Sequence, residues 1–381
     1  MSTLALLNGR VLVEQGFVEG AAVLVDGDRI VDVVPGDDPR CASAERRDLG
    51  GAMLLPGFLD IQVNGGGGVL FNDAPSVESI RAIGAAHRRF GTTSFLPTLI
   101  SDDLSVVSSA ITATRDAIAQ RVPGVIGIHI EGPFLSAARK GAHDAAKFRD
   151  LGSRFVDLLA TLDNGRTLVT LAPERTTPEV IAELAAAGVV ISAGHTNASY
   201  EQVVAALRHG MTGFTHLFNA MSPLGSREPG AVGAALEDER SWCGIIVDGW
   251  HVDPVVLKIA LRCRPRERFM LVTDAMPVVG SDQDSFQLQG RTIRVIDGKC
   301  VDERGTLTGS ALDMASAVRN AVRTLDLSIE DAVRMASTWP AEFLGLGGEL
   351  GRIAPGYRAN LVLANDGLDV IETWIDGRTA A

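Results

Sequence analysis

The chain has 381 residues, of which 46% are hydrophobic and 22% are charged, and its formal net charge is −12. This length suits one barrel-sized domain with a small accessory domain. The acidic balance argues against nucleic acid and anionic membrane surfaces as partners, so an anionic substrate would need a local group of basic residues.

The cysteines and the first residues bear on the compartment. No two of the four cysteines form a CxxC pair, so neither a zinc ribbon nor a redox motif is predicted. Reduced thiols in a cytosolic protein are the simplest interpretation. Residues 1–10 lack the basic and apolar regions of a signal peptide, and no apolar run reaches the ~20 residues of a membrane helix. We therefore expect a cytoplasmic protein.

The first fifty residues predict β-structure. Short apolar stretches alternate with turn signals such as Asn8-Gly9 and Asp26-Gly27. They cover residues 4–7, 10–13, 21–25 and 29–34. The last thirty residues are similar, with stretches at 361–364 and 370–374 before the Asp376-Gly377 turn. We expect one small β domain formed by residues 1–53 and 348–381.

The middle of the chain, residues 54–347, alternates apolar runs with helix-like segments. The apolar runs are 54–61, 93–96, 125–130, 168–171, 189–193, 213–215, 243–247 and 269–273. Helix-like segments include 77–90, 104–121, 178–187 and 200–209. This alternation predicts a (β/α)8 barrel. A doubly wound sheet is the competing fold, but no GxGxxG motif opens a helix after the first strand.

Polar side chains follow most of these runs directly. They are Asp60, Gln62, Asn64, Glu131, His195, His216, Asp248, His251 and Asp274. Such residues just past apolar strands are costly unless they are used or paired. In a barrel these strand ends share one face, and active sites are built there.

Three of these residues form a candidate metal site. Catalytic zinc takes three N or O ligands and leaves a position for water, which Glu131, His195 and His216 can supply. Each of them taken alone could instead be a structural residue. Asp274 is the candidate proton shuttle, since a carboxylate beside the activated water can pass its proton to the leaving nitrogen. Its alternative role is a helix N-cap.

The remaining histidines divide into structural and functional candidates. His129 lies two residues before Glu131 and is expected to be a packed, hydrogen-bonded barrel residue. His87 and His209 lie in helical segments and are expected to be solvated. His143 lies on the loop after the third run, where we expect it to polarise a substrate carbonyl.

Two residues are candidate cations for an anionic substrate group. Arg227 lies in a Pro/Gly-rich loop at 222–230, and His251 follows the seventh run. Both can make charge-assisted hydrogen bonds to such a group. An exposed arginine alone is weak evidence, because most are simply solvated.

Motifs in one order along nearly the whole chain carry a family resemblance. They are 56–60 (PGFLD), 129–134 (HIEGPF), 140–143 (KGAH), 194–198 (GHTNA), 215–221 (THLFNAM), 248–251 (DGWH), 272–275 (VTDA), 305–310 (GTLTGS) and 355–360 (PGYRAN). With them the chain resembles the N-acetylglucosamine-6-phosphate deacetylases of the amidohydrolase superfamily.

The resemblance implies a barrel with a β-sandwich built from both termini, and a homodimer. It implies hydrolysis of N-acetylglucosamine 6-phosphate to glucosamine 6-phosphate and acetate, in amino-sugar catabolism and cell-wall recycling. By motif position, Glu131, His195 and His216 would bind the metal, Asp274 would act as base and then acid, and His143 would assist at the acetyl carbonyl. The sugar phosphate would be held by Ala142, Asn219, Ala220, Arg227, His251, Leu307, Thr308 and Gly309.

The chain departs from many members of the superfamily at the first strand. Relatives with His-x-His at this point bind a second metal, whereas this chain has Gln62 and Asn64. We therefore expect one divalent metal per subunit, with zinc as the first candidate and Fe2+ or Co2+ as alternatives.

Three other functions stay open at this point. The same chemistry on N-acetylgalactosamine 6-phosphate differs by one hydroxyl of the substrate. A cyclic amidase, such as a dihydroorotase or dihydropyrimidinase, usually needs the histidine pair and a bridging lysine, which this chain lacks. A non-catalytic scaffold should have lost metal ligands or the proton shuttle. This chain keeps the three candidate ligands, Glu131, His195 and His216, and the candidate shuttle Asp274.

Overall fold

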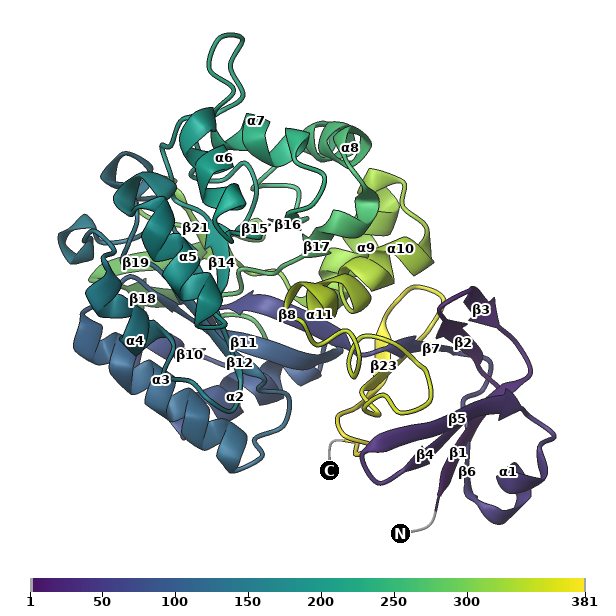
Figure 1. Ribbon diagram of the computed structural model, residues 1–381. Helices are drawn as coiled ribbons and strands as arrows, with labels where there is room; N and C mark the ends of the chain where they lie inside the picture. The colour runs from purple at the N-terminus through teal and green to yellow at the C-terminus, as the bar shows by residue number, and fades with distance from the viewer. Residues whose placement is uncertain (1–2, 380–381) are drawn as a thin grey trace.

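The computed structural model describes residues 3–379 and confirms the predicted (β/α)8 barrel (Figure 1). Eight parallel strands form one sheet in the order β17-β16-β15-β14-β13-β12-β11-β8, and a parallel bridge from Val63 to Ala275 joins its two edges. The strands are β8 (Phe58–Val63), β11 (Thr92–Ile100), β12 (Gly127–Glu131), β13 (Arg166–Leu171), β14 (Val190–Ala193), β15 (Gly213–Phe214), β16 (Trp242–Ile245) and β17 (Phe269–Leu271). Their carboxyl ends therefore meet on one face.

Helices cover the outside of this sheet. They are α2 (Val77–Arg88), α3 (Leu104–Ala119), α4 (Val156–Leu159), α5 (Pro178–Ala186), α6 (Tyr200–Arg208), α7 (Gly230–Glu237), α8 (Pro254–Cys263), α9 (Met314–Leu325), α10 (Ile329–Met335) and α11 (Thr338–Phe343). Local sequence sets where they begin. Ser76 and Thr177 cap α2 and α5, and Ser199 with Gln202 forms a capping box at α6. No helix among residues 3–379 is long and apolar enough to cross a membrane.

Strands from both ends of the chain pair with each other beside the barrel. The strands and helix of this region are β1 (Leu4–Leu7), β2 (Arg10–Val13), β3 (Gly16–Val18), β4 (Ala21–Asp26), β5 (Arg29–Pro35), α1 (Pro39–Ser43), β6 (Glu45–Asp48), β7 (Met53–Pro56), β22 (Leu361–Ala364) and β23 (Val370–Trp374). They form two sheets, β5-β4-β1-β6 and β23-β22-β7-β2-β3. We call these the terminal sheets. They share a core, which includes Leu6, Leu361 and Trp374 and is separate from the barrel core.

The apolar run at 54–61 is two strands rather than one. β7 belongs to the terminal sheets, and only β8 belongs to the barrel. Gly57 separates them: its N–H donates to the carbonyl of Asn360, and a Cβ there would lie 2.2 Å from the Thr93 hydroxyl oxygen. Predicting the first barrel strand from residue 54 was therefore wrong. We propose that the boundary between the two domains lies at 56/57 instead of 53/54.

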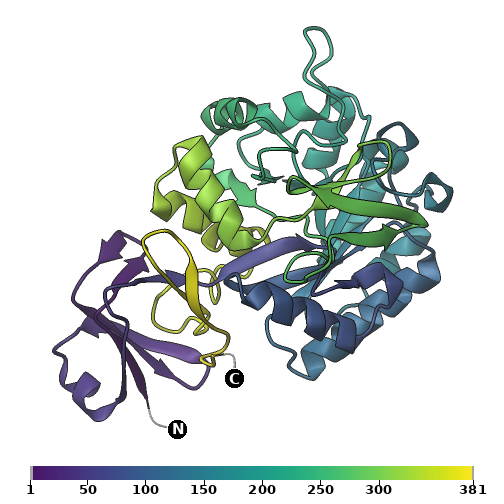
Figure 2. The same cartoon turned by 180° about the vertical axis from the view of Figure 1, so that it is seen from behind.

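A small antiparallel sheet, which the sequence pattern did not indicate, follows the eighth barrel strand. It comprises β18 (Ser285–Leu288), β19 (Arg291–Ile296), β20 (Lys299–Val301) and β21 (Leu307–Ser310), and it lies across one face of the barrel (Figure 2). A short pair, β9 (Gly65–Gly66) and β10 (Val69–Leu70), follows the first barrel strand. Both insertions extend the carboxyl face of the barrel.

Candidate active site

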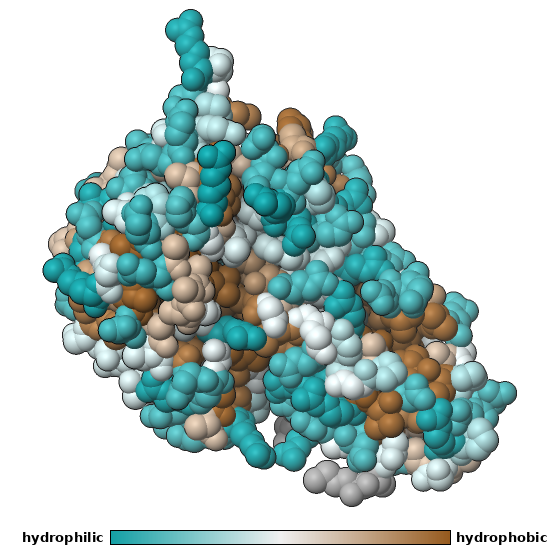
Figure 3. Space-filling view, viewed as in Figure 1, coloured by the Kyte–Doolittle hydropathy of each residue, from teal (hydrophilic) through white to brown (hydrophobic). Residues whose placement is uncertain are grey.

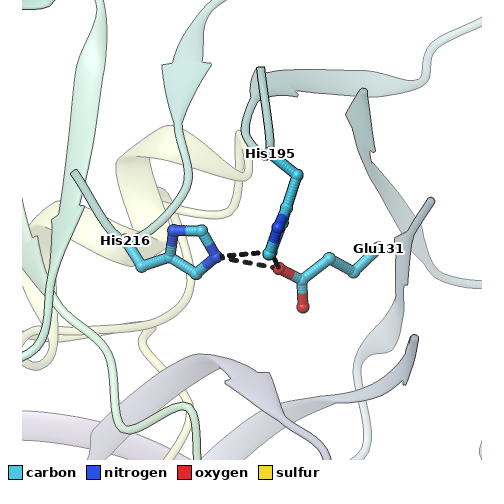
Figure 4. A group of neighbouring side chains, drawn as sticks. All are labelled: Glu131, His195 and His216. Atoms are coloured by element: carbon cyan, nitrogen blue, oxygen red, sulfur yellow. Dashed lines mark hydrogen bonds and ion pairs between the residues drawn. The ribbon is translucent and has the colours of Figure 1, made fainter. Parts of the chain in front are cut away.

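Glu131, His195 and His216 converge at the carboxyl face of the barrel, each at or just past the end of a different strand (Figure 4). Nε2 of His195 lies 3.2 Å and Nε2 of His216 lies 3.0 Å from Oε1 of Glu131. The two Nε2 atoms are 3.1 Å apart, and all three side chains are buried. The structure thus brings the three predicted metal ligands together.

The protonation of His195 shows why a cation fits there. Its Nδ1 lies 2.9 Å from the carbonyl oxygen of Arg139, so Nδ1 donates its proton to this oxygen and Nε2 is the ring nitrogen that faces Glu131. Such an outer hydrogen bond is typical of metal-binding histidines. A divalent metal with N, N and O ligands satisfies all three groups.

The backbone is strained at the same residues. His195, His216 and Asp274 have φ angles of 46°, 35° and 52°, in the left-handed region that non-glycine residues rarely adopt. Ala220, near His216, has a φ of 51°. Each such residue costs about 1–3 kcal/mol, and strain of this kind clusters at functional sites.

Asp274 lies in the same pocket and is held by two amides. Its Oδ1 accepts hydrogen bonds from Nδ2 of Asn64 at 2.6 Å and Nε2 of Gln62 at 3.2 Å. Burial, and then the charge of Glu131, raises the pKa of Asp274 to about 6. A carboxyl group with this pKa can both accept and release a proton near neutral pH.

The amides of Gln62 and Asn64 therefore serve carboxylates. Nε2 of Gln62 donates to Oε2 of Glu131 as well as to Asp274, both at 3.2 Å. Gln62 thus links a candidate metal ligand to the candidate proton shuttle.

His143 lines the pocket, with its ring centroid 4.3 Å from that of His195. Burial, followed by the charge on His195, holds the pKa of His143 well below its ordinary value. Its Nδ1 contacts the hydroxyl of Ser101 at 2.8 Å. Ser101 directly follows β11, and sequence analysis missed it because the predicted second strand stopped at residue 96, before Pro97 and Thr98.

Most of the predicted sugar-binding residues line this pocket too. They are Ala142, Asn219, Ala220, His251, Leu307 and Gly309. Thr308 is buried but does not line it. His251 is fixed by Asp248, whose Oδ2 lies 2.6 Å from its Nδ1. No lysine or arginine lines the pocket within the described chain.

Arg227 does not reach this pocket from its own chain. It lies in the exposed stretch 223–228 between β15 and α7. This segment projects from the body of the molecule in Figure 1, and its tip is hydrophilic in Figure 3.

The structure shows which of the other histidines are buried and which are exposed. His129 is fully buried, with Nε2 2.7 Å from the Thr170 hydroxyl, so the structural assignment is confirmed. His209 is exposed, as expected. The expectation for His87 was wrong, because its ring is fully buried and Nε2 lies 2.9 Å from the carbonyl oxygen of Gly65. Its helical spacing from the buried Ile80 and Ile83 was the available signal.

Comparisons with known proteins agree with this geometry. The chain is 49% identical over 326 residues to an N-acetylgalactosamine-6-phosphate deacetylase of Shewanella sp. (strain ANA-3), covering 85% of this chain and 82% of that protein. It is 34% identical over 377 residues to an N-acetylglucosamine-6-phosphate deacetylase of Haemophilus influenzae, covering 98% of each. A crystal structure of N-acetylglucosamine-6-phosphate deacetylase from Pasteurella multocida matches with a TM-score of 0.95 and 35% identity over the full length of both chains.

A model of the amidohydrolase family matches residues 53–380. This range includes the barrel, the three clustered ligands and Asp274. Together with relatives above 30% identity over most of the chain, the match shows that this chain belongs to the amidohydrolase family.

Proposed function

We propose that this protein hydrolyses the N-acetyl group of N-acetylglucosamine 6-phosphate, giving glucosamine 6-phosphate and acetate. The observation that carries the proposal is the buried cluster of Glu131, His195 and His216 in one pocket with Asp274 and His143. Deacetylases of this substrate align with nearly the whole chain. The protein would serve amino-sugar catabolism and cell-wall recycling.

The proposed chemistry divides the work among the pocket residues. A divalent ion held by Glu131, His195 and His216, with zinc as the first candidate, supplies Lewis-acid activation of the attacking water and the acetyl carbonyl. Asp274 accepts the proton of that water and then delivers it to the leaving nitrogen. His143 donates a hydrogen bond to the carbonyl oxygen, where negative charge develops. One ion per subunit is proposed, because Gln62 and Asn64 donate to carboxylates.

N-acetylgalactosamine 6-phosphate is the second candidate substrate. The relative from Shewanella sp. (strain ANA-3), a deacetylase of this sugar phosphate, is 49% identical to this chain. The N-acetylglucosamine-6-phosphate deacetylase of Haemophilus influenzae is 34% identical. The two sugars differ only in the orientation of one hydroxyl. Both fit the chemistry of the pocket, so we carry both into the test.

The phosphate group supports a homodimer. The pocket of one chain offers His251 but no lysine or arginine, and Arg227 projects away from it. A second copy could supply Arg227 to this pocket, and an arginine fork suits phosphate oxygens.

We further propose a cytoplasmic location, since the described cysteines are all free thiols.

Acetate release from a panel of sugars tests these proposals. The panel pairs N-acetylglucosamine and N-acetylgalactosamine, each with and without the 6-phosphate, using enzyme loaded with one zinc per chain. We expect release from at least one phosphorylated sugar and a much higher kcat/KM than for its unphosphorylated form. The ratio between the two phosphorylated epimers assigns the substrate. Release from none of the four would favour a non-catalytic scaffold.

A further inference from the structure

We propose that Ser101 is a positioning residue that fixes the tautomer of His143, so that His143 presents an N–H to the pocket. Ser101 contacts Nδ1 of His143 twice: its hydroxyl oxygen lies at 2.8 Å, and its backbone nitrogen lies at 3.3 Å. Both residues are buried, with exposed fractions of 0% and 4%, so water does not compete strongly for these bonds. The inference rests on the proposed deacetylation.

The backbone contact decides the direction of the hydrogen bonds. A backbone N–H can only donate, so Nδ1 of His143 must accept and carries no proton. The Ser101 hydroxyl then donates to the same Nδ1, because its other acceptor, the carbonyl oxygen of Glu131, is farther away at 3.5 Å. A neutral imidazole with a bare Nδ1 is protonated at Nε2. His143 is therefore a donor at its other nitrogen.

The peptides around this pair are tied to the small antiparallel sheet. Nε2 of Gln289, in the turn between β18 and β19, donates to the carbonyl of Ser101 at 3.1 Å. Arg291, at the start of β19, donates to the carbonyl of Ala142. The sheet thus holds the residue before His143 and the serine opposite it. The peptide that carries the Ser101 N–H is held separately, because Nδ2 of Asn72 donates to its carbonyl oxygen, that of Ile100, at 3.0 Å.

This arrangement separates the roles of the two candidate proton-handling groups. A His143 fixed as the Nε2–H form donates a hydrogen bond to the acetyl oxygen and does not remove a proton from water. Asp274, with a raised pKa, remains the group that moves the proton. Loss of the Ser101 hydroxyl leaves only the longer backbone contact. The other tautomer, which turns a lone pair toward the developing negative charge, then gains population.

The test combines kinetics with nitrogen NMR of histidine-labelled, zinc-loaded enzyme. His143 signals are assigned by their loss in His143→Gln. We expect the parent to show His143 protonated at Nε2, and Ser101→Ala to show a larger Nδ1–H fraction. We expect kcat of Ser101→Ala to fall about fivefold to tenfold, the size of one neutral hydrogen bond, with little change in KM. Ser101→Thr, which retains a hydroxyl, should recover most of kcat.

Ser94→Ala is the matched control, because Ser94 is a buried serine of the same strand that contacts Asn360 far from His143. It should keep the parental kcat and the His143 spectrum. A parental His143 protonated at Nδ1, or a Ser101→Ala enzyme indistinguishable from Ser94→Ala, would overturn the proposal. If the parent deacetylates neither phosphorylated sugar, the proposed function fails, while the NMR spectrum still reports the tautomer.

Discussion

Two hollows in this molecule differ in how their charged groups are paired. A larger one lies between the terminal sheets and the barrel, where Arg266 pairs with Asp331 and Arg352 with Glu342, both at 2.5 Å. In the pocket at the carboxyl face, by contrast, one carboxylate oxygen of Glu131 and the Nε2 atoms of two histidines converge. Paired, partly exposed charges contribute little to stability, whereas buried polar atoms that converge are unfavourable unless a proton or a metal ion joins them. The convergence of buried metal-binding side chains, rather than the volume of the hollow, identifies the active site.

The backbone repeats this contrast. In the terminal sheets, left-handed residues such as Asn8 and Asp376 are of types that tolerate this conformation in turns. At the barrel face, His195, His216 and Asp274 adopt it at positions where they line the active-site pocket. Strain at the barrel face thus falls on residues that line the active-site pocket, which is typical of a region shaped by function. Experiments on the two regions can test this contrast.

Removing the metal should have the largest effect. Chelation should abolish deacetylation, because the attacking water and the carbonyl both lose their activation. Adding back one equivalent of zinc should restore activity and raise Tm, since the ion binds only the folded cluster. Metal analysis and calorimetry check this. A requirement for two ions per chain would contradict the view that Gln62 and Asn64 serve carboxylates.

Asp274→Asn should come next. The change keeps the side chain's shape but removes proton transfer, so we expect kcat to fall by about 10²–10⁴ while metal content stays the same. A buried carboxyl group at a strained position does not stabilise the fold, so Asp274→Asn should not lower the free energy of unfolding. Steady-state kinetics with metal analysis checks the result. Parental kcat with full metal occupancy would point to another shuttle, with His143 the next candidate.

The pH profile sharpens the same prediction. The pKa of Asp274 is raised to about 6, and the reaction needs its deprotonated form first. The kcat of the parental enzyme should therefore be at its maximum above this pKa and should decline as the pH falls through about 6. The decline should be absent from any residual activity of Asp274→Asn. A parental profile that stays flat from neutral pH down to 5 would argue against this assignment.

Arg227→Ala should have a smaller effect, confined to binding. Loss of one charge-assisted contact to phosphate should raise KM roughly ten- to a hundredfold with little change in kcat. Arg240→Ala, at an exposed arginine after α7, is the control and should match the parent. If Arg227→Ala discriminates against unphosphorylated sugars as strongly as the parent does, Arg227 does not read the phosphate.

Mixing subunits locates Arg227. In a mixed dimer of Arg227→Ala and Asp274→Asn, one pocket contains both intact residues only if Arg227 acts across the interface. Random mixing should then restore about a quarter of the parental sites. If Arg227 acts within its own chain, no pocket is restored.

Sequence reasoning succeeded where local patterns decide the structure. The alternation of runs predicted the barrel, and strand ends predicted that Glu131, His195 and His216 lie together. It failed where tertiary pairing decides. The run around Gly57 is split because β7 pairs with strands from the C-terminal end, a long-range contact that periodicity does not encode. Ser101 was missed because the strand continues past Pro97. The path of the loop carrying Arg227 depends on neighbours that one sequence does not specify.

Leu6→Ala should have the smallest effect on catalysis and a clear one on stability. Leu6 is fully buried in the core of the terminal sheets, so a cavity there should lower the free energy of unfolding by about 2–5 kcal/mol. Because this core is separate from the barrel core, the pocket should keep its geometry, and kcat should stay within about twofold of the parental value. Urea denaturation and steady-state kinetics measure both quantities. Val31→Ala, at a half-exposed position of the same sheet, is the control and should change stability by less than about 0.5 kcal/mol. A large fall in kcat for Leu6→Ala at full metal occupancy would show that the terminal sheets shape the active site, and the contrast between the two regions would then fail.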